Sequence, residues 1–550
     1  MNPNQRRARP RIAPTAAVAG VTLTAVLAGS VVTAAGVKAA ERVSGSPTAA
    51  ATASPVLDLV VPVKTQTVAR YKGESIGLYG LGFYAVAPKT VEIRTQRGTS
   101  YKDPIATTLM VGEGAEQTTT KLPAGITANP STFTKFLDVR VTNPAGKSVY
   151  SSKVDFCLNS YEQNRVSADA VAETPYPQQC GNHPYALGGV FGLPAGWATP
   201  VLGDYSSTPS FAGKDGTYTL KATVNKQWRK ALKISDADAT STIKVKVKTV
   251  KEGSGYGAGA THDMNHNHGV TMAGMDMNAK ELSPQHAARE AARKAALGAP
   301  NTPAATKPSS SRISSAAAAD LPKPDLRSLP AYQIALDTTS RKKKTYLSFG
   351  ATVWNAGPSP LVVDGFRQNG KSVLDAYQYF FDKDGKQVGY TPAGSMQWDP
   401  RTGHNHWHFK DFASYRLLDS TKKKAIISGK EAFCLAPTDA VDLNVDGAQW
   451  QPASTDLYTA CGQGNANLLS IREVLNTGWG DTYGQYLPGQ SFNITNVKNG
   501  VYYIQTIANP SKKLAESNYA NNSALRKVKI GGKPGGKRTI KIYPYQGIGG

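Results

Sequence analysis

Short runs of alternating hydrophobic and polar residues recur along most of the chain. Residues 90–94 (TVEIR) and 243–248 (IKVKVK) are two clear examples, and Gly, Pro and Asn separate such runs. A period of two is typical of β-strands that bury one face, whereas helical periodicity is scarce here. The pattern therefore predicts an all-β fold.

The strand patterns fill two stretches, residues 55–250 and residues 321–550. Residues 251–320 between them are of low complexity, rich in Gly, Ser, Ala and Pro, with a short helix expected around residues 281–297. Such composition is typical of a linker. We therefore expect two β-sandwich-like domains joined by this linker, preceded by an Ala/Ser/Thr/Pro spacer at residues 40–54.

The two β-rich halves resemble each other in sequence. Residues 152–158 (SKVDFCL) align with residues 429–435 (GKEAFCL), and a Gly-Trp pair at 196–197 is repeated at 478–479. The order of the matches predicts that the first half is a degenerate copy of the second, although β-sandwich strands can also resemble each other by chance. Aligning Phe136 on Phe412 sets Ala128, Pro130 and Thr132 opposite three histidines of the second half, so the first half is expected to be non-catalytic.

The N-terminus has the pattern of an export signal. Four arginines precede an uncharged stretch at residues 12–36, and small residues flank Lys38. This pattern predicts a signal peptide over residues 1–39, with an uncleaved membrane anchor as the alternative. The protein is thus expected to be secreted or extracytoplasmic, where its four cysteines can form disulfides. The simplest pairing keeps each bridge within one half: Cys157 with Cys180 and Cys434 with Cys461.

The chain is strongly basic, with a formal net charge of +24 over 550 residues. Such an excess attracts anionic surfaces, and an anionic cell envelope is a plausible partner. No recognised nucleic-acid module accompanies the short lysine runs, so no nucleic-acid partner is expected.

Three histidines alternate within five residues, at His404, His406 and His408, although the whole chain has only eight. On an extended strand, residues i, i+2 and i+4 share one face, so the three side chains are expected to converge. Three imidazoles suit Zn, Cu, Fe or Ni and leave coordination positions open. The alternative is a histidine-rich surface turn.

Four motifs in order resemble the lysyl oxidase family. Residues 403–419 (GHNHWHFKDFASYRLLD) are similar to that family's copper-binding segment, residues 429–435 to the segment with the cofactor lysine, residues 481–484 (DTYG) to the segment with the cofactor tyrosine, and residues 508–522 to the closing strand and turn. The resemblance covers about residues 325–530. It implies copper on the three histidines and a lysine tyrosylquinone cofactor formed when Lys430 captures the oxidised ring of Tyr483.

The implied activity is copper-dependent amine oxidation. The quinone carbonyl condenses with a primary amine or peptidyl lysine, a base removes the α-proton, and the products are an aldehyde, ammonia and hydrogen peroxide, with molecular oxygen as co-substrate. Asp481 or Asp411 could be that base, and the spacing selects neither. Animal members carry a cysteine directly before the first histidine, where this chain has Gly403.

The linker contains a second metal-binding candidate. Three histidines and four methionines crowd into sixteen residues: His262, Met264, His266, His268, Met272, Met275 and Met277. Thioether and imidazole ligands suit copper, so this segment could act as a copper donor; the alternative is an oxidation-prone spacer. A non-catalytic copper-binding or copper-buffering protein is accordingly the second hypothesis for function. A zinc hydrolase is the third, although no His-Glu-x-x-His motif is present.

Overall fold

The computed structural model describes residues 55–548 with gaps at 79–80, 182, 203–209, 251–306, 309–320, 339–342, 369, 383–384, 402–403, 424, 429, 431 and 453–456. Nearly all regular structure in the described residues is β-strand, which confirms the predicted all-β class. The exceptions are the short helices η1 (Gly114–Glu116), α1 (Lys226–Ala231) and α4 (Leu457–Cys461). No helix in these ranges has the length and apolar character needed to cross a membrane. The predicted signal peptide, the spacer, the 281–297 helix and the His262–Met277 cluster all lie outside the described residues.

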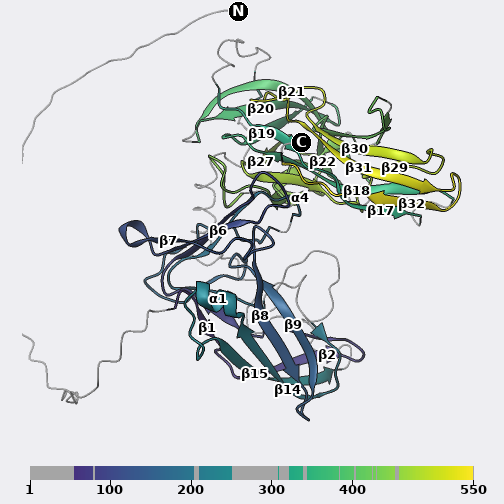
Figure 1. Cartoon of the computed structure of the whole chain (residues 1–550). Helices are drawn as coiled ribbons and strands as arrows, with labels where there is room; N and C mark the ends of the chain where they lie inside the picture. Colours follow the sequence, from purple (N-terminus) through teal and green to yellow (C-terminus); the bar gives the residue numbers. More distant parts are fainter. Residues whose placement is uncertain are drawn as a thin grey trace, which may run out of the picture. The chain divides into compact units, whose positions relative to one another are not determined.

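The strands of the first half form three larger sheets and one small one (Figure 1). In order across each sheet they are β1 (Asp58–Val60), β4 (Tyr84–Val86), β12 (Trp197–Pro200) and β10 (Asn164–Arg165); β11 (Gly188–Leu193), β5 (Val91–Gln96), β6 (Ala106–Val111) and β7 (Thr118–Lys121); β2 (Thr65–Tyr71), β15 (Thr240–Val250), β14 (Gly216–Val224), β8 (Phe133–Thr142) and β9 (Ser148–Phe156); and β13 (Ser210–Phe211) with β3 (Ile76–Gly77).

The strands of the second half also form three sheets. Their orders are β16 (Leu326–Ser328), β18 (Tyr346–Asn355), β28 (Trp479–Tyr483) and β26 (Asp439–Ala440), with β17 (Tyr332–Asp337) and β29 (Ser491–Asn493) beside β18; β25 (Ala432–Phe433), β22 (His406–Lys410), β21 (Gln387–Asp399), β20 (Val373–Phe381), β19 (Leu361–Arg367) and β27 (Ser470–Leu475); and β24 (Ala425–Ile427), β23 (Ala413–Leu418), β30 (Gly500–Ala508), β31 (Ser523–Gly532) and β32 (Arg538–Ile542).

The two halves repeat the same strand order. The sheet β1-β4-β12-β10 corresponds to β16-β18-β28-β26, β11-β5-β6-β7 corresponds to β27-β19-β20-β21, and β9-β8-β14-β15 corresponds to β24-β23-β30-β31. The corresponding strands also follow one another in the same order along the chain. One edge differs, because β2 runs parallel to β15 whereas β32 runs antiparallel to β31. This repetition favours the predicted duplication.

The strands that carry the predicted histidines extend one sheet of this shared plan. Strands β22 and β25 continue the second-half sheet beyond β21, whereas the described first-half sheet ends at β7. The residues aligned with β25 instead belong to β9, where Phe156 pairs with Phe133 of β8. Between β7 and β8 the chain forms turns at Ala128, Pro130 and Thr132, the positions aligned with the three histidines. Those residue types offer no imidazole, so the first half lacks the predicted metal ligands.

Each half has its own hydrophobic core, and the two halves also contact each other. One core consists of residues between Val56 and Val247, and the largest core of the second half also takes in Tyr176 and Val190 from the first half. Residues 53–550 form one compact unit. The predicted domain boundaries stay a prediction.

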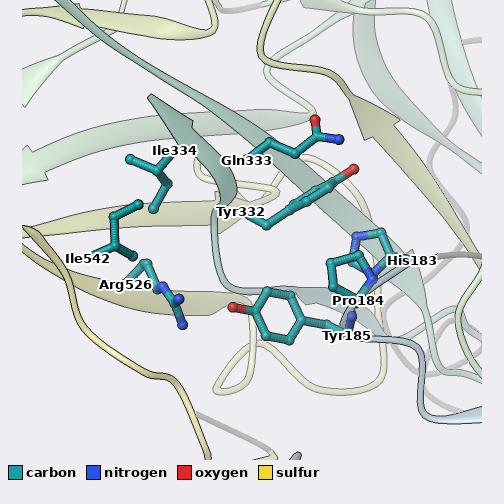
Figure 2. Close-up of a pocket in the computed structure, with 8 residues that line it drawn as sticks. All are labelled: His183, Pro184, Tyr185, Tyr332, Gln333, Ile334, Arg526 and Ile542. Atoms are coloured by element: carbon teal, nitrogen blue, oxygen red, sulfur yellow. Dashed lines mark hydrogen bonds between the residues drawn. The ribbon is translucent and has the colours of Figure 1, made fainter. Parts of the chain in front are cut away.

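Both predicted disulfides are present, Cys157–Cys180 and Cys434–Cys461. The second bridge ties the segment after β25 to α4, so it anchors the chain a few residues beyond Lys430. A cavity of about 480 Å³ lies elsewhere in the molecule (Figure 2). Its lining includes Tyr185, Tyr332 and Arg526 and none of the predicted site residues.

A buried ion pair joins the edge strand β27 to its neighbour β19, in the sheet that also contains the histidine-bearing strand β22. Asp364 on β19 and Arg472 on β27 are register partners, and Arg472 Nε and Nη2 contact the two carboxylate oxygens at 2.5 and 2.6 Å. Asp364 is fully buried and Arg472 is 4% exposed. Removing one partner leaves the other charge buried without this ion pair.

We therefore predict that Arg472→Ala lowers the free energy of unfolding by about 3–5 kcal/mol, measured by chemical denaturation. The matched control is Lys513→Ala, which breaks the more exposed Lys513–Asp411 pair (side chains 47% and 30% exposed) and should cost no more than about 1 kcal/mol. Equal effects of the two variants would contradict the prediction.

Candidate active site

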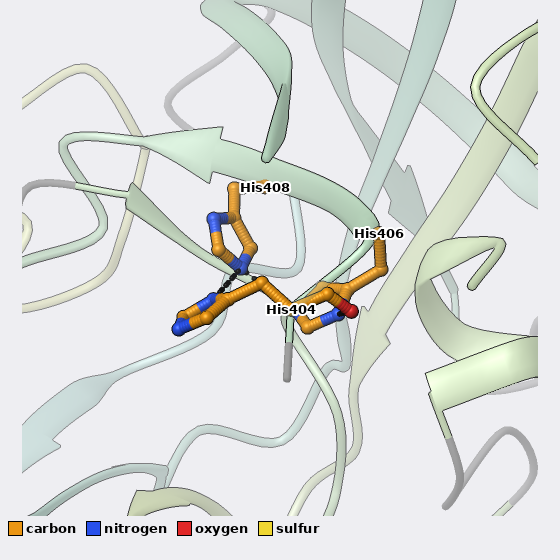
Figure 3. Close-up of side chains that lie close together, drawn as sticks. All are labelled: His404, His406 and His408. Atoms are coloured by element: carbon orange, nitrogen blue, oxygen red, sulfur yellow. Dashed lines mark hydrogen bonds between the residues drawn. The ribbon is translucent and has the colours of Figure 1, made fainter. Parts of the chain in front are cut away.

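The three histidines converge, but not on one strand as expected. Strand β22 begins at His406, so it carries only His406 and His408, while His404 lies in the preceding turn. Asn405 between them has φ +50°, a left-handed conformation that ends the alternation there. The three side chains are 2–4% exposed, and one ring nitrogen from each lies within 4.8 Å of the others (Figure 3).

Burial keeps the three imidazoles neutral. Desolvation lowers the pKa of His404 to about 4 and that of His408 to about 2, and it also lowers the pKa of His406. The neutral ring is the form that binds metal. The cluster is therefore in its ligating form at neutral pH.

The hydrogen bonds of the rings leave nitrogen atoms available to a metal. His406 Nδ1–H donates to the His404 carbonyl oxygen at 2.5 Å, so its Nε2 is unprotonated. That Nε2 lies 2.8 Å from Nε2 of His408. Nε2 of His404 is buried and has no hydrogen-bond partner in the described part of the structure. Three neutral imidazoles with free ring nitrogens fit copper or another borderline transition metal.

The predicted cofactor residues lie against each other. Lys430 is 5% exposed, and its Nζ lies 4.1 Å from the centroid of the Tyr483 ring. Tyr483 is the last residue of β28, and its ring packs edge-on against Phe433 of β25. The two residues are 53 positions apart in the sequence, so only the pairing of the sheets brings them together. Gly489 lies over Lys430, where an added Cβ would come within 2.9 Å of the lysine Cβ.

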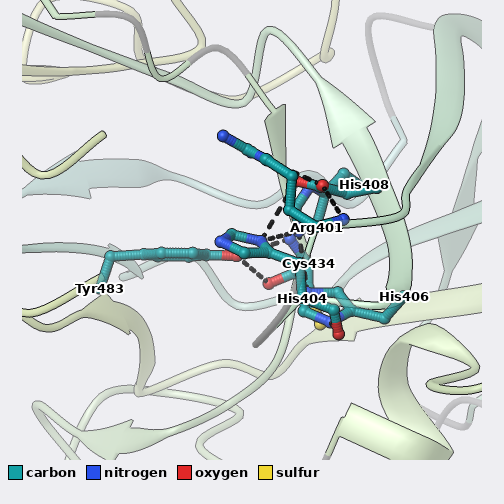
Figure 4. A network of polar contacts seen from close by, with 7 residues as sticks. Arg401, His404, His406, His408, Cys434 and Tyr483 are labelled. Carbon is teal, nitrogen blue, oxygen red and sulfur yellow. Dashed lines mark hydrogen bonds and ion pairs between the residues drawn. The ribbon is translucent and has the colours of Figure 1, made fainter. Parts of the chain in front are cut away.

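Three consecutive backbone N–H groups hold the side chains around this pair. Cys434 N–H donates to the Tyr483 hydroxyl at 2.6 Å, and the hydroxyl in turn donates to the Cys434 carbonyl at 3.1 Å (Figure 4). Leu435 N–H donates to Glu473 at 3.0 Å, and Ala436 N–H donates to Asp481. The segment that follows Lys430 is thereby fixed against the strand that carries Tyr483.

Burial shifts the ionisable groups here toward their neutral forms. The pKa of Lys430 falls to about 8, mainly by desolvation, with Asp481 opposing the fall. Desolvation raises the pKa values of Asp481, Glu473 and Tyr483 well above their ordinary values. Sequence reasoning missed Glu473. Its position in the sequence, in the middle of the strand SIREVL (residues 470–475), is the feature that could have indicated it.

The structure separates the two candidate bases. Asp481 is 3% exposed, interacts electrostatically with Lys430, and has an oxygen (Oδ2) without a hydrogen-bond partner among the described residues. Asp411 lies in a turn and its carboxylate pairs with Lys513 at 2.5 Å. Only Asp481 is close to the Lys430–Tyr483 pair.

A cavity of about 320 Å³ opens beside these groups. Its lining includes His408, Lys430, Asp399 and Gly489, so it reaches both the histidine cluster and the lysine. A pocket of this volume can enclose a small ligand or a single extended side chain.

The site lies within the part of the chain that matches known proteins. Residues 378–535 match the lysyl oxidase family. Human protein-lysine 6-oxidase is 30% identical over 150 residues, which are 27% of this chain and 32% of the human protein. The pig protein-lysine 6-oxidase is 29% identical over 150 residues and is covered over 53% of its length. Lysyl oxidase homolog 3B of zebrafish is 27% identical over 141 residues, 15% of its length.

The all-β scaffold thus places a buried three-histidine cluster, which could hold a metal ion, near a buried lysine–tyrosine pair. The matched segment is similar to the lysyl oxidase family, the family that its motifs resemble. The chain covers about a third of the length of the human relative.

We predict that Lys430 titrates near pH 8 in the metal-free protein, because burial disfavours its ammonium form. Exposed lysines titrate at about 10.4. NMR titration of isotope-labelled lysine side chains measures the difference, with the resonance assigned from Lys430→Arg. Asp481→Asn should lower the pKa further, because it removes the negative charge that favours the ammonium ion. A Lys430 midpoint above pH 10 would contradict this account.

Proposed function

We propose that the protein is a secreted copper-dependent amine oxidase that uses a lysine tyrosylquinone formed from Lys430 and Tyr483. The observation that carries the proposal is the 4.1 Å distance between the Lys430 amine and the Tyr483 ring centroid, where Lys430 also lines a pocket together with His408. The match of residues 378–535 to the lysyl oxidase family supports it.

His404, His406 and His408 are the proposed copper ligands. When bound, copper and the quinone together supply the oxidation of a primary amine by molecular oxygen and water, with release of an aldehyde, ammonia and hydrogen peroxide. The chain's own residues hold the reacting groups in place. Their burial excludes water, which strengthens the electrostatic interactions inside the site.

Lys430 is suited to be the nucleophile of the crosslink, because only a neutral amine can attack the ring. The pKa of about 8 makes the neutral form accessible near physiological pH. Lys153, its counterpart in the first half, is half exposed and forms a salt bridge with Asp138. A lysine at this position in the fold is therefore reactive only where the second-half core buries it.

Asp481 is the proposed base for removal of the substrate α-proton. Burial raises the pKa of Asp481, with the Lys430 charge opposing the rise, and a raised pKa makes the carboxylate a stronger base than an exposed one. The unpartnered Oδ2 is available to accept a proton.

The proposed substrate is a peptidyl lysine or another primary amine. Its unbranched aliphatic chain suits the cavity of about 320 Å³ that Lys430 lines. The two disulfides agree with the proposed extracytoplasmic location.

Peptide mapping by mass spectrometry after maturation with copper and oxygen tests the proposal. We expect a crosslinked peptide that joins Lys430 to Tyr483, shifted in mass by phenylhydrazine, together with peroxide release from an amine substrate. Lys430→Ala should bind copper but lose the crosslink and most turnover. The matched control Lys153→Ala should keep both.

Unmodified Lys430 and Tyr483 peptides in fully copper-loaded, aerated protein would contradict the quinone assignment. They would favour the non-catalytic copper-binding function instead. Full amine oxidase activity of Lys430→Ala would also contradict it.

We expect Asp481→Asn to form the crosslink but to lower kcat by about 100- to 10,000-fold, because the amide cannot accept the substrate proton. Stopped-flow kinetics with a deuterated amine measures the step directly. Asp411→Asn is the control and should keep near-normal kcat. If Asp411→Asn alone lowered kcat, the base would be misassigned.

A further inference from the structure

Asp399 is a buried carboxylate whose two oxygen atoms both contact Arg401. Arg401 Nε contacts Asp399 Oδ1 at 2.9 Å, Nη2 contacts Oδ2 at 2.5 Å, and the Arg401 backbone N–H donates to Oδ1 at 3.1 Å. The Asp399 side chain is 9% exposed and that of Arg401 is 61% exposed. Arg401 thus contacts the buried carboxylate from an exposed position. It can be substituted without exposing the core.

The same carboxylate lies against two of the three histidines. Its Oδ2 is 3.2 Å from His404 Nδ1 and 3.5 Å from His408 Nδ1. The pairing of β21 with β22 sets this arrangement, because Asp399 is the register partner of His406. The position of the carboxylate is therefore fixed both by the sheet and by Arg401.

All three imidazoles then have an oxygen atom near Nδ1. His406 Nδ1 contacts the His404 carbonyl, and Nδ1 of His404 and of His408 face Asp399. His404 Nδ1 also lies 3.4 Å from His408 Nε2, slightly farther than from Asp399. An acceptor at Nδ1 favours the tautomer with its proton there, which leaves Nε2 free to bind a metal.

We propose that Asp399 is a positioning residue of the metal centre, which orients the rings of His404 and His408 and favours the His408 tautomer that presents Nε2 to the cluster. Arg401 holds the carboxylate in the required place. A carboxylate behind a ligating histidine also raises the basicity of the ring and brings negative charge close to a divalent cation. The inference rests on the proposed function, because it assumes that the three histidines bind copper.

Copper competition titration against a chelator, on the full-length chain, tests the inference. Asp399→Asn keeps the size of the side chain but removes its charge, and it should weaken copper binding by about 10- to 100-fold. The Cu(II) electron paramagnetic resonance spectrum of the variant should differ from that of the unchanged protein. Arg401→Ala alters only an exposed side chain and should weaken binding by a smaller factor.

Two controls separate this inference from the proposed function. Asp411→Asn removes one negative charge three residues after His408 without touching the histidines, and it should bind copper normally. His406→Ala should abolish binding. If His406→Ala abolishes binding while Asp399→Asn and Arg401→Ala stay within twofold of the unchanged protein, the role of Asp399 is wrong and the ligand assignment stands. If His406→Ala also binds normally, the metal site itself is wrong.

Discussion

Desolvation is the constraint on which the site depends. The second half buries an amine, two carboxyl groups, a phenol and three imidazoles beside one another, and burial shifts the pKa of each toward its neutral form. A neutral amine can act as a nucleophile and a neutral imidazole can bind metal, so the chemistry proposed here follows from the absence of water. The core can hold so many polar groups because the backbone N–H groups from Cys434 to Ala436 bind three of them.

The repeated strand order suggests how such a site can be added to an existing fold. Both halves have the same arrangement of sheets, but only the second extends one sheet by β22 and β25. The extension brings the histidines and Lys430 next to β28, a strand with a counterpart in both halves. In the first half that counterpart is β12, where the residue aligned with Asp481 is the buried Thr199. The scaffold is thus common to both halves, and the reactive groups belong to one.

A disulfide and a hydrogen bond hold strands β22 and β25 in place at the edge of their sheet. The Cys434–Cys461 bridge ties the segment after β25 to α4, and Trp407 of β22 donates a hydrogen bond to the Asn465 carbonyl just beyond that helix. The buried Trp407 side chain faces away from the ligating rings and packs in the core. The residues between the histidines therefore have a structural role of their own.

The sequence by itself predicted the β-class, both disulfide pairings and the candidate residues of the proposed site, because alternation, cysteine positions and motif order are properties that the chain carries without its fold. Only the tertiary structure decided which groups meet. The sequence left Asp481 and Asp411 equivalent, and it gave no reason to single out Asp399 or Glu473, because their partners lie on other strands or across a turn. It also predicted one strand through all three histidines, whereas Asn405 turns the chain and the side chains converge from a turn and a strand. Contacts between distant strands depend on sheet register, which no local pattern encodes.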